Sequence, residues 1–150
     1  MPKRRLSDLV TALSDLRHDV KIEADEMVNE VALKLVTELA YTTPVDTSKA
    51  LSNWRVTNRQ ILGVRDAHVE GEGGSTRKAS ALRTIANARR VINRRKSGGK
   101  LTVYNAAPYI RRLDDGWSSQ QPPGFILRAI KVATGQLSRK RKASRKRRFK

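Results

Sequence analysis

The stretch TPVDTSKALSNWRV, residues 43–56, separates a long helical pattern from a strand-like pattern. Pro44 disfavours helical backbone at the residue before it, so the preceding helix is predicted to end here. Asp46 or Thr47 offers a side-chain oxygen that can cap a short turn of helix, and a strand is predicted to begin at Trp54. The stretch carries little charge, so phosphate binding does not explain it. By itself it predicts the end of a helix, a cap and the start of a strand.

A helical pattern without Pro or Gly precedes this stretch over residues 6–40. Its apolar residues recur at intervals of three and four. A helix of this length reaches about 50 Å at 1.5 Å per residue, more than a domain of this size covers with its own core. Three interpretations stay open: two helices with a bend near residues 18–24, a short coiled coil, or packing on a neighbouring subunit. The stripe contains Leu6, Leu9, Leu13, Leu16, Val20, Ala24, Met27, Val31 and Leu35.

Helical and strand patterns alternate after the stretch. A weak strand is predicted at residues 61–64, followed by a Gly-rich break. A basic helix is predicted over residues 75–96, with Ser75 as its cap, and a second strand over residues 100–106. The two stronger patterns place a helix between the two main strands.

The last third of the chain predicts two further helices and a tail. Pro108 is suited to the first position of a short helix that Gly116 closes, and Phe125 opens an amphipathic helix. Residues 139–150 are almost entirely cationic and hold too little apolar surface to fold alone. They are predicted to be disordered until a partner is bound.

The length and composition of the chain limit which folds and which classes of protein are possible. The 150 residues suit one domain, predicted over residues 1–138, with a polybasic tail over 139–150. The fold class is α+β: a long N-terminal helix, a small antiparallel sheet packed with further helices, and a disordered basic C-terminal tail. The absence of Cys excludes disulfides and thiolate sites. No apolar run reaches the roughly 20 residues of a membrane span, so a soluble, unsecreted chain with no membrane partner is expected.

Charge is distributed unevenly along the chain. The formal net charge is +18, yet residues 6–40 hold eight acids and three cations, a net of −5, so the remainder carries +23. Such asymmetry indicates either a basic region for nucleic acid or complementary faces for self-assembly.

The sequence offers little for catalysis. Neither His18 nor His68 has a Ser or Asp at a recognisable motif spacing, so neither is expected to act as a base or ligand. Asp66, Glu70 and Glu72 resemble a carboxylate cluster for a divalent cation, but they lie beside glycines in a loop where a solvated turn is the simpler interpretation. No enzyme, cofactor or metal is predicted.

Nucleic-acid binding has stronger support, because nine of the last twelve residues are Lys or Arg. A solvated tail that binds an acidic protein surface is the alternative. The candidate contacts to nucleic acid or a protein partner are Arg89, Arg90, Arg94, Arg95, Arg139, Lys140, Arg141, Lys142, Arg145, Lys146, Arg147 and Arg148.

Three segments in order, TPVDTSKALSNWRV, KLTVYNAAPYIRRLDDGW and PPGFILRAI, resemble the landmarks of tailed-phage neck and tail-completion proteins, often described as minor tail components. That family has a long helix before T-P-V-D-T-G-x-L, an Asn before P-Y-A-x-x-L-E-x-G, and a Pro and an aromatic residue before its last helix. Ser48 stands here for Gly, Ile110 for Ala and Asp114 for Glu. The matching residues are Thr43, Pro44, Val45, Asp46, Thr47, Leu51, Asn105, Pro108, Tyr109, Leu113, Asp114, Gly116, Pro123, Phe125 and Ala129.

The resemblance implies a non-enzymatic virion protein assembled in the host cytoplasm. Copies of it would form a ring at the head-tail junction, between portal or adaptor and tail-tube or tail-terminator proteins, around the DNA channel. Packaged DNA is a further candidate partner. Trp54 is expected to anchor the core or an interface. A general nucleic-acid-binding protein is the alternative.

Overall fold

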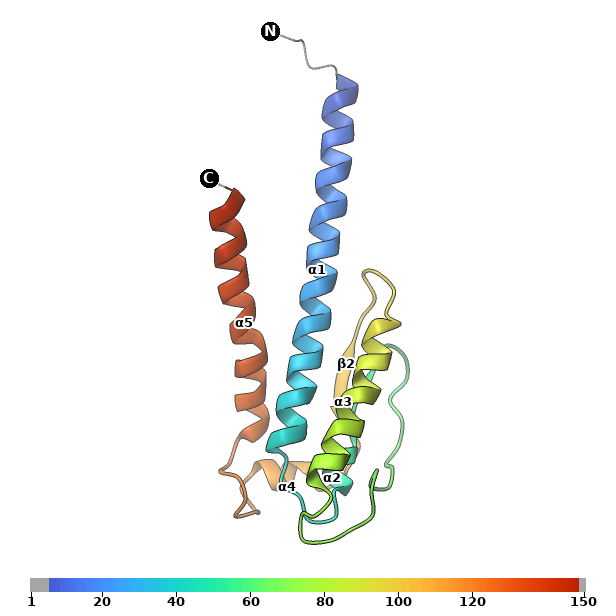
Figure 1. Cartoon of the computed structure of the whole chain (residues 1–150), viewed down its shortest axis with the longest axis vertical. Coiled ribbons are helices and arrows are strands. Elements are labelled where there is room, and N and C mark those ends of the chain that lie inside the picture. Colours follow the sequence, from blue (N-terminus) through green and yellow to red (C-terminus); the bar gives the residue numbers. More distant parts are fainter. Residues whose placement is uncertain (1–5, 149–150) are drawn as a thin grey trace.

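The structure, a computed structural model, describes the backbone of residues 6–148 and the side chains of residues 7–135 and 139. It has the predicted α+β class, with a long N-terminal helix, a two-stranded antiparallel sheet and further helices (Figure 1). The elements are α1 (Leu6–Thr42), α2 (Lys49–Ser52), β1 (Trp54–Thr57), α3 (Arg77–Asn93), β2 (Thr102–Asn105), α4 (Ile110–Asp114) and α5 (Phe125–Arg148).

The first helix, α1, is a single element of 37 residues, which confirms the predicted long N-terminal helix and excludes one of the three open interpretations, the bend near residues 18–24. No Pro or Gly interrupts its hydrogen-bond ladder. It ends at Thr42, just before Pro44, as the local sequence predicts. No helix in the described part of the chain combines the length and the apolar character needed to cross a bilayer.

The core surrounds the C-terminal half of α1. In Figure 1, α5 lies along one side of α1, and α3 with the sheet lies along the other. Three buried clusters join these elements, each built on a different part of α1. They are Ala32, Val36, Val56, Ala88 and Ile92; Leu39, Trp54, Phe125 and Ala129; and Ala40, Val45, Leu51 and Ala81.

The sheet consists of β1 and β2, which pair antiparallel with Trp54 opposite Asn105. The predicted weak strand at residues 61–64 is wrong, because these residues lie in an irregular loop and are exposed. The side chain of Asn53 holds this loop: its Oδ1 accepts from the backbone N–H of Arg65 at 2.9 Å, and its Nδ2 donates to the Arg65 carbonyl at 2.8 Å. The side-chain amide of Asn53 thus makes the two hydrogen bonds with the Arg65 backbone that a neighbouring strand would otherwise make.

Several helix boundaries differ from the prediction. The basic helix α3 starts at Arg77 rather than at residue 75, and the Ser75 hydroxyl donates to the Glu72 carbonyl instead of capping the helix. The short helix α4 starts at Ile110, two residues after Pro108. Turn residues with several local hydrogen-bonding options account for these differences.

The backbone of residues 139–148 continues α5, whereas the sequence predicted a disordered tail. Lys, Arg and Ala are good helix formers, and neither Gly nor Pro follows Gly135. Among these tail residues only the side chain of Arg139 is described, and it is exposed.

Candidate functional site

The first motif segment is anchored where α1 ends. The Thr43 hydroxyl donates to the Leu39 carbonyl at 2.5 Å and accepts a hydrogen bond from Nε1 of Trp54 at 2.7 Å. Trp54 is 6 % exposed, and Thr43 is fully buried. Pro44 and Val45 are also buried beside them. The tryptophan therefore acts as a core anchor that ties β1 to the end of α1.

Among the described residues other than glycine, Ser48 has a positive φ. The angle is 62°, in the left-handed region. The Ser48 hydroxyl lies 2.6 Å from that of Thr76, and both residues are buried. Gly adopts this conformation at little cost, whereas a Cβ is strained in it. Ser48 therefore adopts a backbone turn that favours Gly, and its side chain adds a buried hydrogen bond.

The predicted cap of α2 is not formed by Asp46 or Thr47. The N-cap of α2 is Ser48, which makes no side-chain capping bond. Thr47 is exposed. The Asp46 carboxylate accepts from the backbone N–H of Gly73 at 3.0 Å, and its carbonyl accepts from Gly74 at 3.0 Å. Asp46 thus fastens the loop that leads to α3.

Asn105 connects the first and second motif segments. Its Nδ2 donates to the Ala50 carbonyl at 2.8 Å, and its Oδ1 accepts from the backbone N–H of Ala107 at 2.8 Å. The Asn105 side chain therefore fixes the backbone that follows β2 and also binds the backbone of α2 at Ala50. Tyr109 follows on the same side of α2, and burial raises the pKa of its phenol.

Asp114 connects the second and third motif segments. Its Oδ1 accepts from the backbone N–H of Ile126 at 2.9 Å, in the first turn of α5, and its carbonyl accepts from Gly124 at 2.7 Å. A carboxylate at a helix N-terminus satisfies a free donor and complements the helix dipole. Phe125, beside it, is fully buried against Leu39 and Trp54.

Gly116 closes α4 as predicted. Its φ is 91°, and a Cβ there would lie 2.6 Å from Cγ of Pro123. Both the backbone conformation and the contact with Pro123 require a residue without a side chain. Pro108 is exposed at the start of this segment, and Leu113 packs on the cluster around Phe125.

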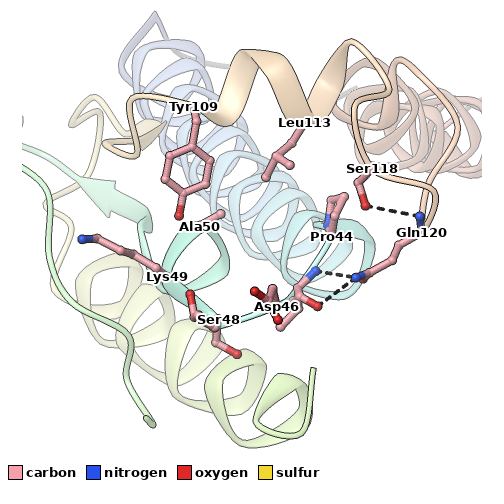
Figure 2. A pocket seen from close by; sticks show the side chains of 11 residues that line it. Pro44, Asp46, Ser48, Lys49, Ala50, Tyr109, Leu113, Ser118 and Gln120 are labelled. Carbon is pink, nitrogen blue, oxygen red and sulfur yellow. Dashed lines mark hydrogen bonds between the residues drawn. The ribbon is translucent and has the colours of Figure 1, made fainter. Parts of the chain in front are cut away.

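A pocket of about 260 Å³ lies between the first and second motif segments (Figure 2). Gln120 lies at its edge, donating from Nε2 to the Val45 carbonyl and accepting at Oε1 from the Val45 N–H, both at 2.9 Å. Arg77 also donates to Oε1 of Gln120, at 2.6 Å. No sequence pattern singled out Gln120, and Arg77 counted only as one cation of the basic helix, because neither belongs to a motif. We call the contacts of Thr43, Ser48, Trp54, Asn105, Asp114, Gly116 and Gln120 the motif junction.

The candidate cationic contacts on α3 divide into two groups. Arg89 and Arg90 are exposed on the outer side of α3, and Arg94, directly after its last residue, is exposed as well. Arg95 is instead structural: its side chain is 2 % exposed and pairs with Asp25 of α1 at 2.9 Å. The Arg95 guanidinium already binds Asp25 and is not exposed. This ion pair is therefore incompatible with the predicted contact to nucleic acid or to a partner. The side chains of Lys140, Arg141, Lys142, Arg145, Lys146, Arg147 and Arg148 lie outside the described ones.

Asp25 holds the loop after α3 against α1. Besides Arg95, it accepts from the Ser97 hydroxyl and from the backbone N–H of Gly98, the latter at 2.9 Å. The Ser97 and Gly98 hydrogen bonds, with the charge of Arg95, lower the pKa of the Asp25 carboxyl.

The residues considered for catalysis do not come together. His18 is exposed on α1, far along the chain from His68, whose pKa is lowered by burial and then by the charges of Arg65, Arg83 and Arg55. The Asp66 side chain is fully exposed, and its Oδ1 lies 3.8 Å from Nζ of Lys49. Among the described residues, no group of three or more His, Asp or Glu side chains is arranged to hold a metal ion.

Comparisons of the chain with protein-family models, with curated proteins and with solved structures found no match.

Proposed function

We propose that the chain is a non-enzymatic structural subunit of a tailed-phage virion, forming part of the neck ring that joins the head connector to the tail around the DNA channel. The observation that carries this proposal is the motif junction. Three segments that resemble the family's landmarks lie far apart in the sequence, yet hydrogen bonds of Asn105 and Asp114 join them in space. Motifs that maintain one another's geometry are expected of a structural scaffold rather than of a catalytic site.

Three details of the junction support the same family. Ser48 has the left-handed backbone that the family's glycine would adopt readily, and Gly116 lies against Pro123, the proline of the third segment. Asp114 carries out a carboxylate's role at a position where the family has Glu. The substitutions in the motifs are therefore compatible with their backbone geometry.

Self-association is supported by the part of α1 that the chain does not cover. Residues 7–24 are exposed throughout, although they include several large apolar side chains. An exposed apolar stripe of this length is characteristic of an interaction surface. Within the proposal, copies of the chain contact one another here, while portal or adaptor and tail-tube or tail-terminator proteins contact other surfaces.

Deleting the gene in the phage that encodes the chain tests this function. Heads and tails are expected to form separately and to remain unjoined, and the wild-type gene supplied in trans should restore complete particles. Mass spectrometry of purified virions should detect the chain, and immunogold labelling should mark the head-tail junction. Joined, infectious particles without the chain would contradict the proposal.

General nucleic-acid binding is the second candidate, favoured by the exposed cations of α3 and the basic end of α5. Affinity for duplex DNA should be measured against salt for the full chain and for a chain lacking residues 139–150. If the tail binds phosphates, its deletion should reduce the slope of log K against log salt by about 0.9 for each phosphate that the tail neutralises. An unchanged affinity and slope would remove the tail from this function.

A further inference from the structure

We propose that the outer half of α1, residues 7–24, packs in one copy along the solvent-facing side of α3 in a second copy. The inference rests on the proposed function in one respect, that copies of the chain assemble. It adds which two surfaces meet.

The first surface is an apolar stripe on the outer half of α1. Its four large side chains are 47–57 % exposed and recur at intervals of four, three and four residues, so they form one face of the helix. We call this face the outer stripe. Figure 1 shows the same part of α1 extending beyond α3 and the sheet. The outer stripe consists of Leu9, Leu13, Leu16 and Val20.

Acidic residues line one flank of the outer stripe. Successive residues of a helix are about 100° apart around its axis, which places Asp19 next to Leu16 and Asp15 next to Asp19 on one flank, whereas Arg17 lies on the other flank. Both carboxylates are exposed. A surface that accepts the outer stripe therefore needs apolar contact at its centre and positive charge at its edge.

The outer side of α3 has this composition. Its inner side is buried, whereas Ala79, Leu82 and Ala86 form a short exposed apolar row, with Leu82 52 % exposed. Helical spacing places cations along both edges of this row. The two alanines on either side of Leu82 leave room for a second helix to approach. The exposed cations are Lys78, Arg83, Arg89, Arg90 and Arg94.

The two surfaces cannot meet within one chain. The inner side of α3 already packs on the C-terminal half of α1, where Ala88 and Ile92 contact Ala32 and Val36. Since α1 continues without a bend from Leu6 to Thr42, its outer half cannot fold back over the opposite side of α3. The partner with both required surfaces is another copy. Because two different surfaces meet, the contact repeats from copy to copy and suits a closed ring.

Nucleic acid fits this pair of surfaces less well. It would neutralise the cations of α3, but it would leave the outer stripe in water and would be repelled by Asp15 and Asp19. A second copy satisfies both surfaces at once.

Charge reversal with mixing tests the inference. Arg89→Glu/Arg90→Glu makes the α3 surface acidic, and Asp15→Arg/Asp19→Arg makes the α1 surface basic. In each variant alone, two surfaces of like charge face each other. The dissociation constant of self-association, measured by sedimentation at low salt, should therefore rise about tenfold or more. In an equimolar mixture, opposite charges are restored at each contact between unlike variants, where the acidic α1 surface of one meets the native α3 surface of the other, or the basic α1 surface meets the acidic α3 surface. The mixture should therefore assemble, and the difference should shrink as salt rises.

Three controls complete the experiment. Lys100→Glu/Arg111→Glu makes the same charge change at exposed positions outside both surfaces and should leave association unchanged. Circular dichroism should give every variant the wild-type helix content. Leu13→Ser/Leu16→Ser, which removes apolar contact without changing charge, should also abolish association.

The outcomes separate the two proposals. If the wild type associates but the reversed variants associate equally well, or if their mixture stays dissociated, this interface is wrong and the proposed function stands. If the wild type fails to associate alone and with head-connector and tail-tube proteins, both are wrong.

Discussion

The ring of Pro123 lies so close to Gly116 that a Cβ atom on the glycine would be 2.6 Å from Cγ of the proline. Gly116 also has a φ of 91°, which L side chains rarely adopt. This contact closes the turn after α4 against the segment that leads into α5. Two independent requirements thus fall on one residue of the second motif segment.

Gly116→Ala is expected to destabilise the fold by about 2 kcal/mol or more, because backbone strain and overlap with Pro123 add. Chemical denaturation followed by circular dichroism measures the change in the free energy of unfolding. Gly63→Ala is the matched control, since no atom lies within 4 Å of a Cβ there and its φ is not positive. Equal stability of the two variants would contradict the role given to Gly116.

Trp54→Phe is expected to cost about 1–3 kcal/mol, since it removes the hydrogen bond to the buried Thr43 hydroxyl and part of a buried ring. Trp117→Phe makes the same chemical change at a side chain that is 75 % exposed and should have little effect. Urea midpoints of the two variants compare them directly. Similar midpoints would mean that Trp54 does not anchor β1 to α1.

Ser48→Gly should be more stable than Ser48→Ala by about 1 kcal/mol. Both variants lack the hydrogen bond to Thr76, but only Gly relieves the left-handed backbone strain. Differential scanning calorimetry of the pair isolates the backbone contribution. A more stable Ala variant would show that φ at this position is not positive in solution.

Acidic pH should weaken the contacts by which the Asp25 carboxylate holds the loop after α3. The pKa of Asp25 is lowered in the folded chain, so its contribution to stability is present above the unfolded pKa of about 3.9 and is lost as the pH falls through the folded pKa. Asp25→Asn should therefore lower the melting temperature at neutral pH but lose less stability than wild type on acidification. Asp15→Asn, at an exposed position of α1, is the control. Parallel pH profiles for wild type and Asp25→Asn would contradict this account.

Local sequence rules predicted the elements that depend on neighbouring residues. Pro44 correctly marked the end of α1, and Gly116 the end of α4, because each restricts the backbone by itself. The absence of Pro and Gly also indicated that α1 could be continuous, although its length left a bend open as one of three interpretations. The bend is absent because an exposed stripe does not itself break a helix.

Contacts between distant segments were not predictable from the same rules. The local sequence favours Asp46 as a helix cap, but its carboxylate fastens Gly73. Composition favours Arg95 as a surface cation, but its guanidinium pairs with Asp25. Gln120, which bonds Val45 across 75 positions, carries no sequence signal at all. In each case the side chain's chemistry is evident from the sequence, whereas its partner depends on how the chain folds.

The uninterrupted backbone of α1 couples its two ends mechanically. The base of the helix is held at Thr43, and its 37 residues extend about 55 Å from there. A tilt of about 5° at the base would displace the tip sideways by about 5 Å. A small rearrangement of the core around Trp54 that changes the direction of α1 would therefore change the position of the surface that its other end presents.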